Sequence, residues 1–219
     1  MTTQELHGIA HELKFWKGFV QTERFLKGWV ANCVTPELNH KVYDFIHGML
    51  TQHPERDRVK ILDVGSGVVS ILNGLVPQKN LTAVDPLGEL YELVFDYAKH
   101  SIASPLPVPA EELNYKDEYD IVHISNALDH CQEPMTAYQK LKRAVKPGGF
   151  LILQGFENEA TYENWKGFHR YNISIDDEKK RLRIDGSDER VLGTIKDPYF
   201  ADRVTFENNK SWFIFIIKK

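Results

Sequence analysis

The sequence has little of what marks the specialised classes of protein. Its 219 residues include only two cysteines, Cys33 and Cys131, which are too few for a disulfide framework and lack the CxxC spacing of a metal or redox site. We therefore expect two plain buried thiols. The 14 glycines and 10 prolines follow no period, and no block of sequence recurs, which excludes collagen-like and solenoid folds.

An excess of positive charge and a long apolar run are also missing. The 27 basic residues face 31 acidic ones, and the formal charge of −4 gives no general attraction to nucleic acid or to an anionic membrane. No stretch approaches the roughly 18 apolar residues of a membrane span, and the N-terminal MTTQELHGIAHELKFWKG carries acids and histidines where a signal peptide needs apolar residues. These absences predict a cytoplasmic protein without a membrane or nucleic-acid partner.

The composition that is present, 42% hydrophobic and 26% charged, suits one globular domain over residues 1–219. Between residues 11 and 29 apolar side chains recur at three- and four-residue steps, which predicts an amphipathic helix broken near Thr22. A second helix is predicted from Thr35-Pro36-Glu37 to about Thr51. We expect residues 1–52 to form a helical lid with Trp16 or Trp29 near the substrate; the alternative is a helix that only packs on the core.

The hydrophobic period changes at Val59. Short β-branched runs predict buried strands at VKILDV (59–64), LTAVD (81–85), YDIVHIS (119–125) and FLILQG (150–155), with helical segments at 87–100 and 134–145. This alternation predicts an α/β fold with a doubly wound, mostly parallel, Rossmann-like sheet. After residue 156 two hairpins are predicted, YNISI with RLRID and RVTFE with WFIFIIKK; the last is expected to close one sheet edge as an antiparallel C-terminal hairpin.

The strongest functional signal is the turn Asp63-Val64-Gly65-Ser66-Gly67 after the first predicted strand. Glycines let the backbone approach a ligand closely, and a helix after the turn would present free N–H groups. Asp85 stands twenty residues after Gly65 at the end of the second strand, where a carboxylate can accept hydrogen bonds from both hydroxyls of a ribose. Together they predict a nucleoside-containing cofactor, whereas the glycines alone could be a tight turn.

The details of the turn favour one cofactor. A dinucleotide site requires G-x-G-x-x-G, but this chain has Ser70 at the third glycine, and Asp63 would repel a pyrophosphate. The same acid suits the cationic amino-acid end of S-adenosylmethionine. A nicotinamide-dependent oxidoreductase is thereby disfavoured.

Residues 59–155 resemble the class I S-adenosylmethionine-dependent methyltransferase family. The segments that carry the resemblance, in the family's order, are ILDVGSG, LTAVDP, VPAEEL, YDIVHISNALDH and VKPGGFLIL. They look like the family's glycine turn, acidic ribose motif, adenine loop, fourth-strand motif and fifth-strand motif. The resemblance implies S-adenosylmethionine as the cofactor, methyl transfer as the activity, a cofactor-binding core at 59–155, and a substrate-side segment with terminal hairpins at 156–219.

The same resemblance assigns site residues. Asp63, Gly65 and Gly67 would frame the methionine portion, and Asp85 would hold the ribose. The remaining assignments are Ala110 and Glu111 flanking the adenine, and Asn126 beside the sulfonium.

Two positions depart from the family pattern. Val69 replaces the third glycine of that family, which predicts a stiffer turn, and Pro109 replaces the acid before Ala-Glu-Glu. Adenine recognition is then expected from backbone groups and Glu111. Both departures are also compatible with a non-catalytic partner subunit that kept the cofactor fold.

The residues just after the fourth strand bear on the acceptor. Ser125-Asn126-Ala127-Leu128 lacks the two prolines and aromatic of nucleic-acid amino methyltransferases, and Cys131 is followed by Gln132 rather than forming a Pro-Cys nucleophile. We expect a small polar acceptor, with O-methylation of a sugar or related metabolite first and N-methylation of a small amine as the alternative.

Transfer to a hydroxyl needs a proton acceptor, and histidine is the natural base near neutral pH. The candidates for this base are His169, in the polar run 167–172, and His130, after the fourth strand. The alternative for His169 is a place in a solvent-facing loop, and the alternative for His130 is a packing or capping role at a helix start. Asp129, Glu157 and Glu159 raise the question of a metal. No Asp-Asn pair follows the fifth strand, so no metal is expected.

Overall fold

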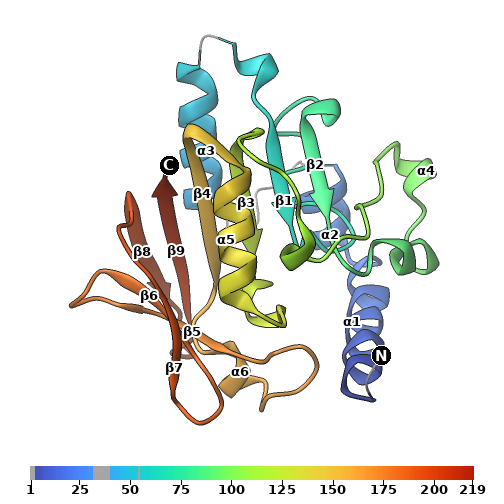
Figure 1. Ribbon diagram of the computed structural model, residues 1–219. Coiled ribbons are helices and arrows are strands. Elements are labelled where there is room, and N and C mark those ends of the chain that lie inside the picture. Colours follow the sequence, from blue (N-terminus) through green and yellow to red (C-terminus); the bar gives the residue numbers. More distant parts are fainter. Residues whose placement is uncertain (1–2, 32–39, 54) are drawn as a thin grey trace.

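In the computed structural model, which describes residues 3–31, 40–53 and 55–219, six strands form a central sheet in the order β2-β1-β3-β4-β9-β8 (Figure 1). Their bounds are β1 Ile61–Val64, β2 Leu81–Val84, β3 Tyr119–Ser125, β4 Val145–Phe156, β8 Phe200–Thr205 and β9 Ser211–Lys218. Strands β1 to β4 run parallel, while β9 runs antiparallel to both β4 and β8. The α/β class and the antiparallel C-terminal hairpin are confirmed.

A separate antiparallel sheet lies outside the central one (Figure 1). Its strands are β5 Asn172–Asp176, β6 Arg181–Asp185 and β7 Val191–Ile195. The first two are the predicted hairpin. The third was not predicted, because VLGTI contains a glycine and is mostly half-buried or exposed, so its pattern is weak.

Helices cover both faces of the central sheet, which confirms the double winding. Within β3, Ile121 packs in the cluster around α3 (His40–Gln52), whereas Val122 and Ile124 pack in the cluster around α5 (Pro134–Ala144). This alternation follows from the two-residue period of a strand. Pro134 begins α5 as the sequence predicted, since its fixed φ and missing N–H suit the first helical position.

Two predicted helical segments differ from the structure. The helix expected after the glycine turn does not form: residues 68–77 are turns, in which Val68 and Val69 are buried and Gly74 has φ +84°. Residues 87–100 form a 3-10 helix (Gly88–Leu93) and a single turn, α4 (Tyr97–His100), rather than one helix. β-branched residues and glycine lower helix propensity, and here tertiary packing prevails over the weak signal.

The N-terminal segment consists of α1 (Thr3–Phe19), α2 (Glu23–Phe25) and a π-helical turn (Leu26–Val30). The break predicted near Thr22 is confirmed, because the Thr22 hydroxyl accepts from the Phe25 N–H and caps α2. Thr35-Pro36-Glu37 and Cys33 lie outside the described residues, while Cys131 is buried as expected. No helix within the described ranges is long and apolar enough to span a membrane.

Helix α1 lies at the end of the sheet toward which the parallel strands run, and the short α6 (Glu159–Tyr162) lies at the same end (Figure 1). Aromatic side chains of α1 and α2 join a third cluster with Val68, Val69 and Tyr91. This cluster binds the N-terminal segment to the glycine turn and to the loop after β2. The fold thus gathers α1, the glycine turn and the ends of β2, β3 and β4 at one edge.

Candidate functional site

The glycine turn follows β1 and needs glycine at both positions. Gly65 and Gly67 have φ of +62° and +65°, a backbone conformation that side chains disfavour. A Cβ on Gly65 would lie 2.4 Å from the Cβ of Ala127, and one on Gly67 would lie 2.2 Å from the indole of Trp16. Both residues are therefore required by conformation and by close approach.

Asp85 joins the glycine turn to the end of β2, as the sequence spacing predicted. Its Oδ2 accepts from the Gly67 N–H at 3.0 Å, and its Oδ1 accepts from the Leu87 N–H at 2.9 Å and the Tyr91 hydroxyl at 3.1 Å. Burial raises the pKa of Asp85, and the two backbone hydrogen bonds and the one from Tyr91 act against that rise. The Asp85 carboxylate thus accepts three hydrogen bonds from within the protein, of the roughly four that its oxygens can accept.

Asp63 lies beneath the turn rather than on its surface. The side chain is 2% exposed; Oδ2 accepts from the Ser70 hydroxyl at 2.5 Å, and Oδ1 lies 2.6 Å from Nδ1 of His123. The Ser70 hydroxyl in turn accepts from the Leu72 N–H at 3.0 Å. Asp63 therefore supports the segment that follows the glycines, because both of its oxygens are used within the protein.

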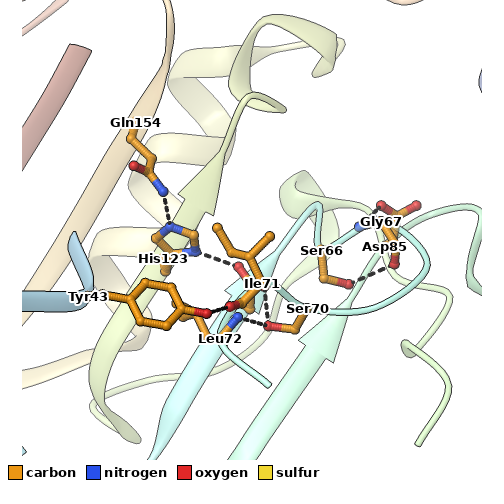
Figure 2. A network of polar contacts seen from close by, with 10 residues as sticks. Tyr43, Ser66, Gly67, Ser70, Ile71, Leu72, Asp85, His123 and Gln154 are labelled. Carbon is orange, nitrogen blue, oxygen red and sulfur yellow. Dashed lines mark hydrogen bonds and ion pairs between the residues drawn. The ribbon is translucent and has the colours of Figure 1, made fainter. Parts of the chain in front are cut away.

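A buried polar line continues from Asp63 across the sheet. His123 on β3 contacts Gln154 on β4 (Figure 2), with 2.9 Å between His123 Nε2 and Gln154 Nε2, and Gln154 Oε1 accepts from Nε1–H of Trp212 on β9 at 3.1 Å. Since the indole only donates, Gln154 presents its NH₂ to His123, and Nε2 of His123 accepts. Nδ1 of His123 then carries the hydrogen and donates to Asp63.

Sequence reasoning did not find His123 and Gln154. The available signal was one polar residue within each of two apolar strands. Because β1 and β3 are paired with Asp63 opposite His123, and β3 and β4 with His123 opposite Ile152, only the register places the polar groups together. The register could not be read from the sequence.

The residues assigned to the adenine and the sulfonium lie at the same edge. Ala110 is buried at the start of a 3-10 turn, and Oε1 of Glu111 accepts from the N–H groups of Gln132 and Glu133 at 2.7 and 3.2 Å, just before α5. Asn126 follows β3 with φ +49°, and its Oδ1 accepts from the Phe156 N–H at 3.0 Å. Glu111 and Asn126 thus connect neighbouring segments of the edge.

The two histidines meet at one acid, which the sequence did not predict. Nδ1 of His169 lies 2.8 Å from Oδ2 of Asp129 and 3.1 Å from Nε2 of His130. Burial lowers the pKa of His130. For His169 burial acts in the same direction, but the hydrogen bond and charge of Asp129 outweigh it, and the pKa is raised.

Helix α1 covers this edge. A Cβ on Gly8 would lie 2.5 Å from the ring of Phe168, and Oε1 of Glu5 accepts from the Gln132 side chain at 3.1 Å. Burial raises the pKa of Glu12 to about 7, and the negative charges of Asp85 and Asp129 contribute to the rise. Glu12 thus lies between the nucleoside end and the histidine end of the site.

Glu157, one of the acids considered as a metal ligand, faces elsewhere. Its Oε1 accepts from the Ile175 N–H at 2.7 Å and lies 3.2 Å from Arg203. These partners hold β5 and β8 to the end of β4. Glu157 therefore serves the fold, whereas Asp129 and Glu159 remain at the site.

The residues present fit a cationic nucleoside cofactor. Gly65 and Gly67 keep the turn free of side chains, with the indole of Trp16 packed on Gly67, and Asp85 places a carboxylate at the strand end. The negative charges of Asp85, Asp129 and Glu159 contribute to the raised pKa of Glu12, and that of Asp129 contributes to the raised pKa of Glu159. Such a set favours a positively charged ligand over a pyrophosphate.

Comparison with known proteins supports the same family. Residues 62–153 match the family of the methyltransferase domain. The chain is 33% identical to a tRNA U34 carboxymethyltransferase of Pseudoalteromonas atlantica over 43% of this chain and 31% of that protein. It is 27% identical to a ubiquinone biosynthesis O-methyltransferase of Rickettsia canadensis over 57% of this chain and 52% of that protein. The chain thus spans between about a third and a half of these relatives.

A solved structure supports the fold. The 1,6-didemethyltoxoflavin-N1-methyltransferase of Burkholderia thailandensis, determined with 1,6-didemethyltoxoflavin and S-adenosylhomocysteine bound, superposes with a TM-score of 0.51 at 15% identity, covering 100% of this chain and 91% of that one. The family match spans β1 to β4, where the glycine turn and Asp85 are found. Residues 62–153 are therefore similar to the methyltransferase domain, as the resemblance to the class I S-adenosylmethionine-dependent methyltransferases predicted.

Proposed function

We propose that the protein transfers a methyl group from S-adenosylmethionine to a small polar acceptor, most specifically to an oxygen of a sugar or related metabolite. The observation that carries this proposal is the pair formed by Asp129 and His169, 2.8 Å apart, at the edge where Asn126 follows β3. A carboxylate that holds one nitrogen of an imidazole leaves the other free to take a proton.

The cofactor supplies a methyl carbon on a positively charged sulfur. Gly65, Gly67 and Asp85 are the residues proposed to hold its methionine and ribose portions, with Asp63 supporting the turn from below. Ala110 and Glu111 are proposed to flank the adenine through the short turn they form, and Asn126 to lie beside the sulfonium. The fixed backbone at these positions orients the donor for in-line attack.

His169 is proposed as the base. Nδ1–H donates to Asp129, so Nε2 is free to remove the acceptor's proton as oxygen bonds to the methyl carbon and the electron pair of the breaking carbon–sulfur bond returns to sulfur. A raised pKa makes the imidazole a stronger base. His130, in contact with the same nitrogen, is the alternative.

A small amine is the second candidate acceptor. The acidic side chains Glu12, Asp129 and Glu159 interact electrostatically and together favour a cation, which an amine is at neutral pH. Nucleic acid is the less favoured class, because the chain has a formal charge of −4, although one relative is named for a tRNA substrate.

The test is a methyl-donor assay against nucleotide sugars, phosphorylated metabolites, small amines and tRNA, followed by variants measured on the acceptor that reacts. His169→Ala is expected to bind S-adenosylmethionine normally and to lose turnover by about 10²–10⁴-fold. His47→Ala, an exposed histidine on α3, is the matched control. Near-full turnover by His169→Ala would contradict the assignment of the base and would make His130 the residue to examine.

A further inference from the structure

Three ligand atoms converge in the cluster of Asp129, His130 and His169. The distances between them are 2.8 Å from Asp129 Oδ2 to His169 Nδ1, 3.1 Å from His169 Nδ1 to His130 Nε2, and 3.7 Å from His130 Nε2 to Asp129 Oδ2. Metal bonds of about 2.0–2.1 Å at right or tetrahedral angles place neighbouring ligand atoms about 2.8–3.4 Å apart, a range that includes the two distances from His169 Nδ1. The triangle has the size and the donor types of a two-histidine, one-carboxylate metal site.

Protons alone do not satisfy this triangle. Nδ1 of His169 carries at most one hydrogen, which can point to Asp129 or to His130 but not to both. A hydrogen on Nε2 of His130 does not resolve this, because an Nδ1 of His169 that donates to Asp129 has no lone pair left to accept it. A cation at the centre would satisfy all three atoms through their lone pairs.

Glu159 supplies a second, independent observation. Its side chain is 8% exposed, and Oε2 has no hydrogen-bond partner. Glu159 begins α6, within electrostatic reach of Asp129 and His169. A buried oxygen without a partner is costly, and a cation or a proton would remove that cost.

The site is held in place before any ion binds. Asp129 and His130 belong to a 3-10 turn (Leu128–His130) after β3, and the loop with His169 is joined to it by the Arg170 N–H donating to the Asp129 carbonyl at 3.1 Å. The side chains of Asp129 and His169 are only 8% and 10% exposed. The positively charged guanidinium of Arg170 lies near the cluster and would repel a cation. It stacks over the ring of Phe168, 5.8 Å from the ring centroid.

We propose that Asp129, His130 and His169 bind a divalent transition-metal ion, with Glu159 beside it. Imidazole and carboxylate together suit Zn²⁺, Fe²⁺, Mn²⁺ or Co²⁺ better than Mg²⁺, which prefers oxygen. No metal was expected from the sequence because no Asp-Asn pair follows the fifth strand. The ligands proposed here form no local motif, since His169 lies some forty residues after Asp129. Three protein ligands leave open positions for an oxygen of the acceptor.

The ion would change how the acceptor is activated; this consequence rests on the proposed function, while metal binding itself does not. With the ion bound, Nδ1 of His169 is a ligand, so the base role proposed above belongs to the metal-free protein. The ion lowers the pKa of a bound hydroxyl. The proton then passes to Oε2 of Glu159, the oxygen bonds to the methyl carbon, and the carbon–sulfur electron pair returns to sulfur.

Metal binding is tested on the full chain after chelator treatment, without cofactor or acceptor. Calorimetric titration with Zn²⁺ and with Co²⁺ is expected to show one ion per chain. Asp129→Asn and His169→Gln are each expected to weaken binding by at least about tenfold. The exposed His47→Gln is expected to bind as the natural chain does.

A spectroscopic measurement on the natural chain covers the case in which those variants do not fold. Bound Co²⁺ should show d–d absorption without a thiolate charge-transfer band, which separates this site from the cysteines, and Mn²⁺ should broaden the imidazole NMR signals of His130 and His169 but not that of His47. Absence of one-to-one binding, a thiolate band, or folded variants that bind normally would overturn the proposal. Failure of methyl transfer with intact metal binding would instead overturn only the proposed function.

Discussion

The indole of Trp16 packs against Gly67, so closely that a Cβ on the glycine would lie 2.2 Å from the ring. Helix α1 therefore covers the backbone to which a cofactor would bind. The same indole lies 6.0 Å from the ring of Tyr91, whose hydroxyl donates to Asp85. The N-terminal helix is in direct contact with both parts of the proposed cofactor site, and its role as a lid stays a prediction.

This contact makes Gly67→Ala doubly unfavourable. The methyl group meets Trp16, and alanine at φ +65° is strained, so the variant should lose about 1–3 kcal/mol of unfolding free energy in urea denaturation. Gly18→Ala, in the same helix as Trp16, is the matched control. A Cβ there has no neighbour within 4 Å, and alanine should stabilise the helix by up to about 1 kcal/mol. Equal effects of the two substitutions would contradict the close packing.

Glu12 predicts a pH dependence of stability. Its pKa rises from 4.5 to about 7 on folding, so the folded chain holds this proton more tightly than the unfolded chain does. The associated stability is complete below pH 4.5 and is lost as pH rises through about 7. Glu12→Gln should therefore match the natural chain at about pH 4 and exceed it by about 1–3 kcal/mol at about pH 8. Urea midpoints at the two pH values measure this, with the exposed Glu178→Gln as control; a constant difference would contradict the burial of Glu12.

The polar line across the sheet predicts the protonation of His123. ¹⁵N NMR of the imidazole should show the hydrogen on Nδ1, because the Trp212 indole orients Gln154 and Gln154 donates to Nε2. Trp212→Phe removes that orienting donor and should cost about 1–3 kcal/mol of unfolding free energy. The hydrogen should stay on Nδ1 in this variant, because the Asp63 carboxylate still accepts there. Hydrogen on Nε2 of His123 in the natural chain would contradict the assignment of Gln154 as the donor and Nε2 as the acceptor.

Much of the fold could be predicted because its signals are local. Four runs of β-branched residues, two of them ended by Gly65 and Pro86, were enough to predict the parallel strands. The two terminal runs were enough to predict the β8–β9 hairpin. The prediction of a helix after the glycine turn was wrong. Val68 and Val69 lie in turns, where they are buried against α1 and α2. Packing partners from a distant segment decided that conformation, and no local pattern records them.

The site was predictable to the same degree. Asp85 and Gly67 were expected to act together from their spacing, and the structure joins them by a hydrogen bond. The sequence treated His130 and His169 as rival candidates and did not indicate that both contact Asp129. Their meeting depends on the loop after α6 folding back onto the end of β3, a long-range contact.

The proposed cofactor site is tested by calorimetric titration of S-adenosylmethionine into the natural chain and into Asp85→Ala, with the exposed Asp188→Ala as control and NAD as a second ligand. The natural chain and the control should bind S-adenosylmethionine at one site and should not bind NAD. Asp85→Ala should lose about 1.5–3 kcal/mol of binding free energy, the scale of hydrogen bonds to a charged group. Unchanged affinity in a folded Asp85→Ala, or no binding by the natural chain, would contradict the proposed cofactor site.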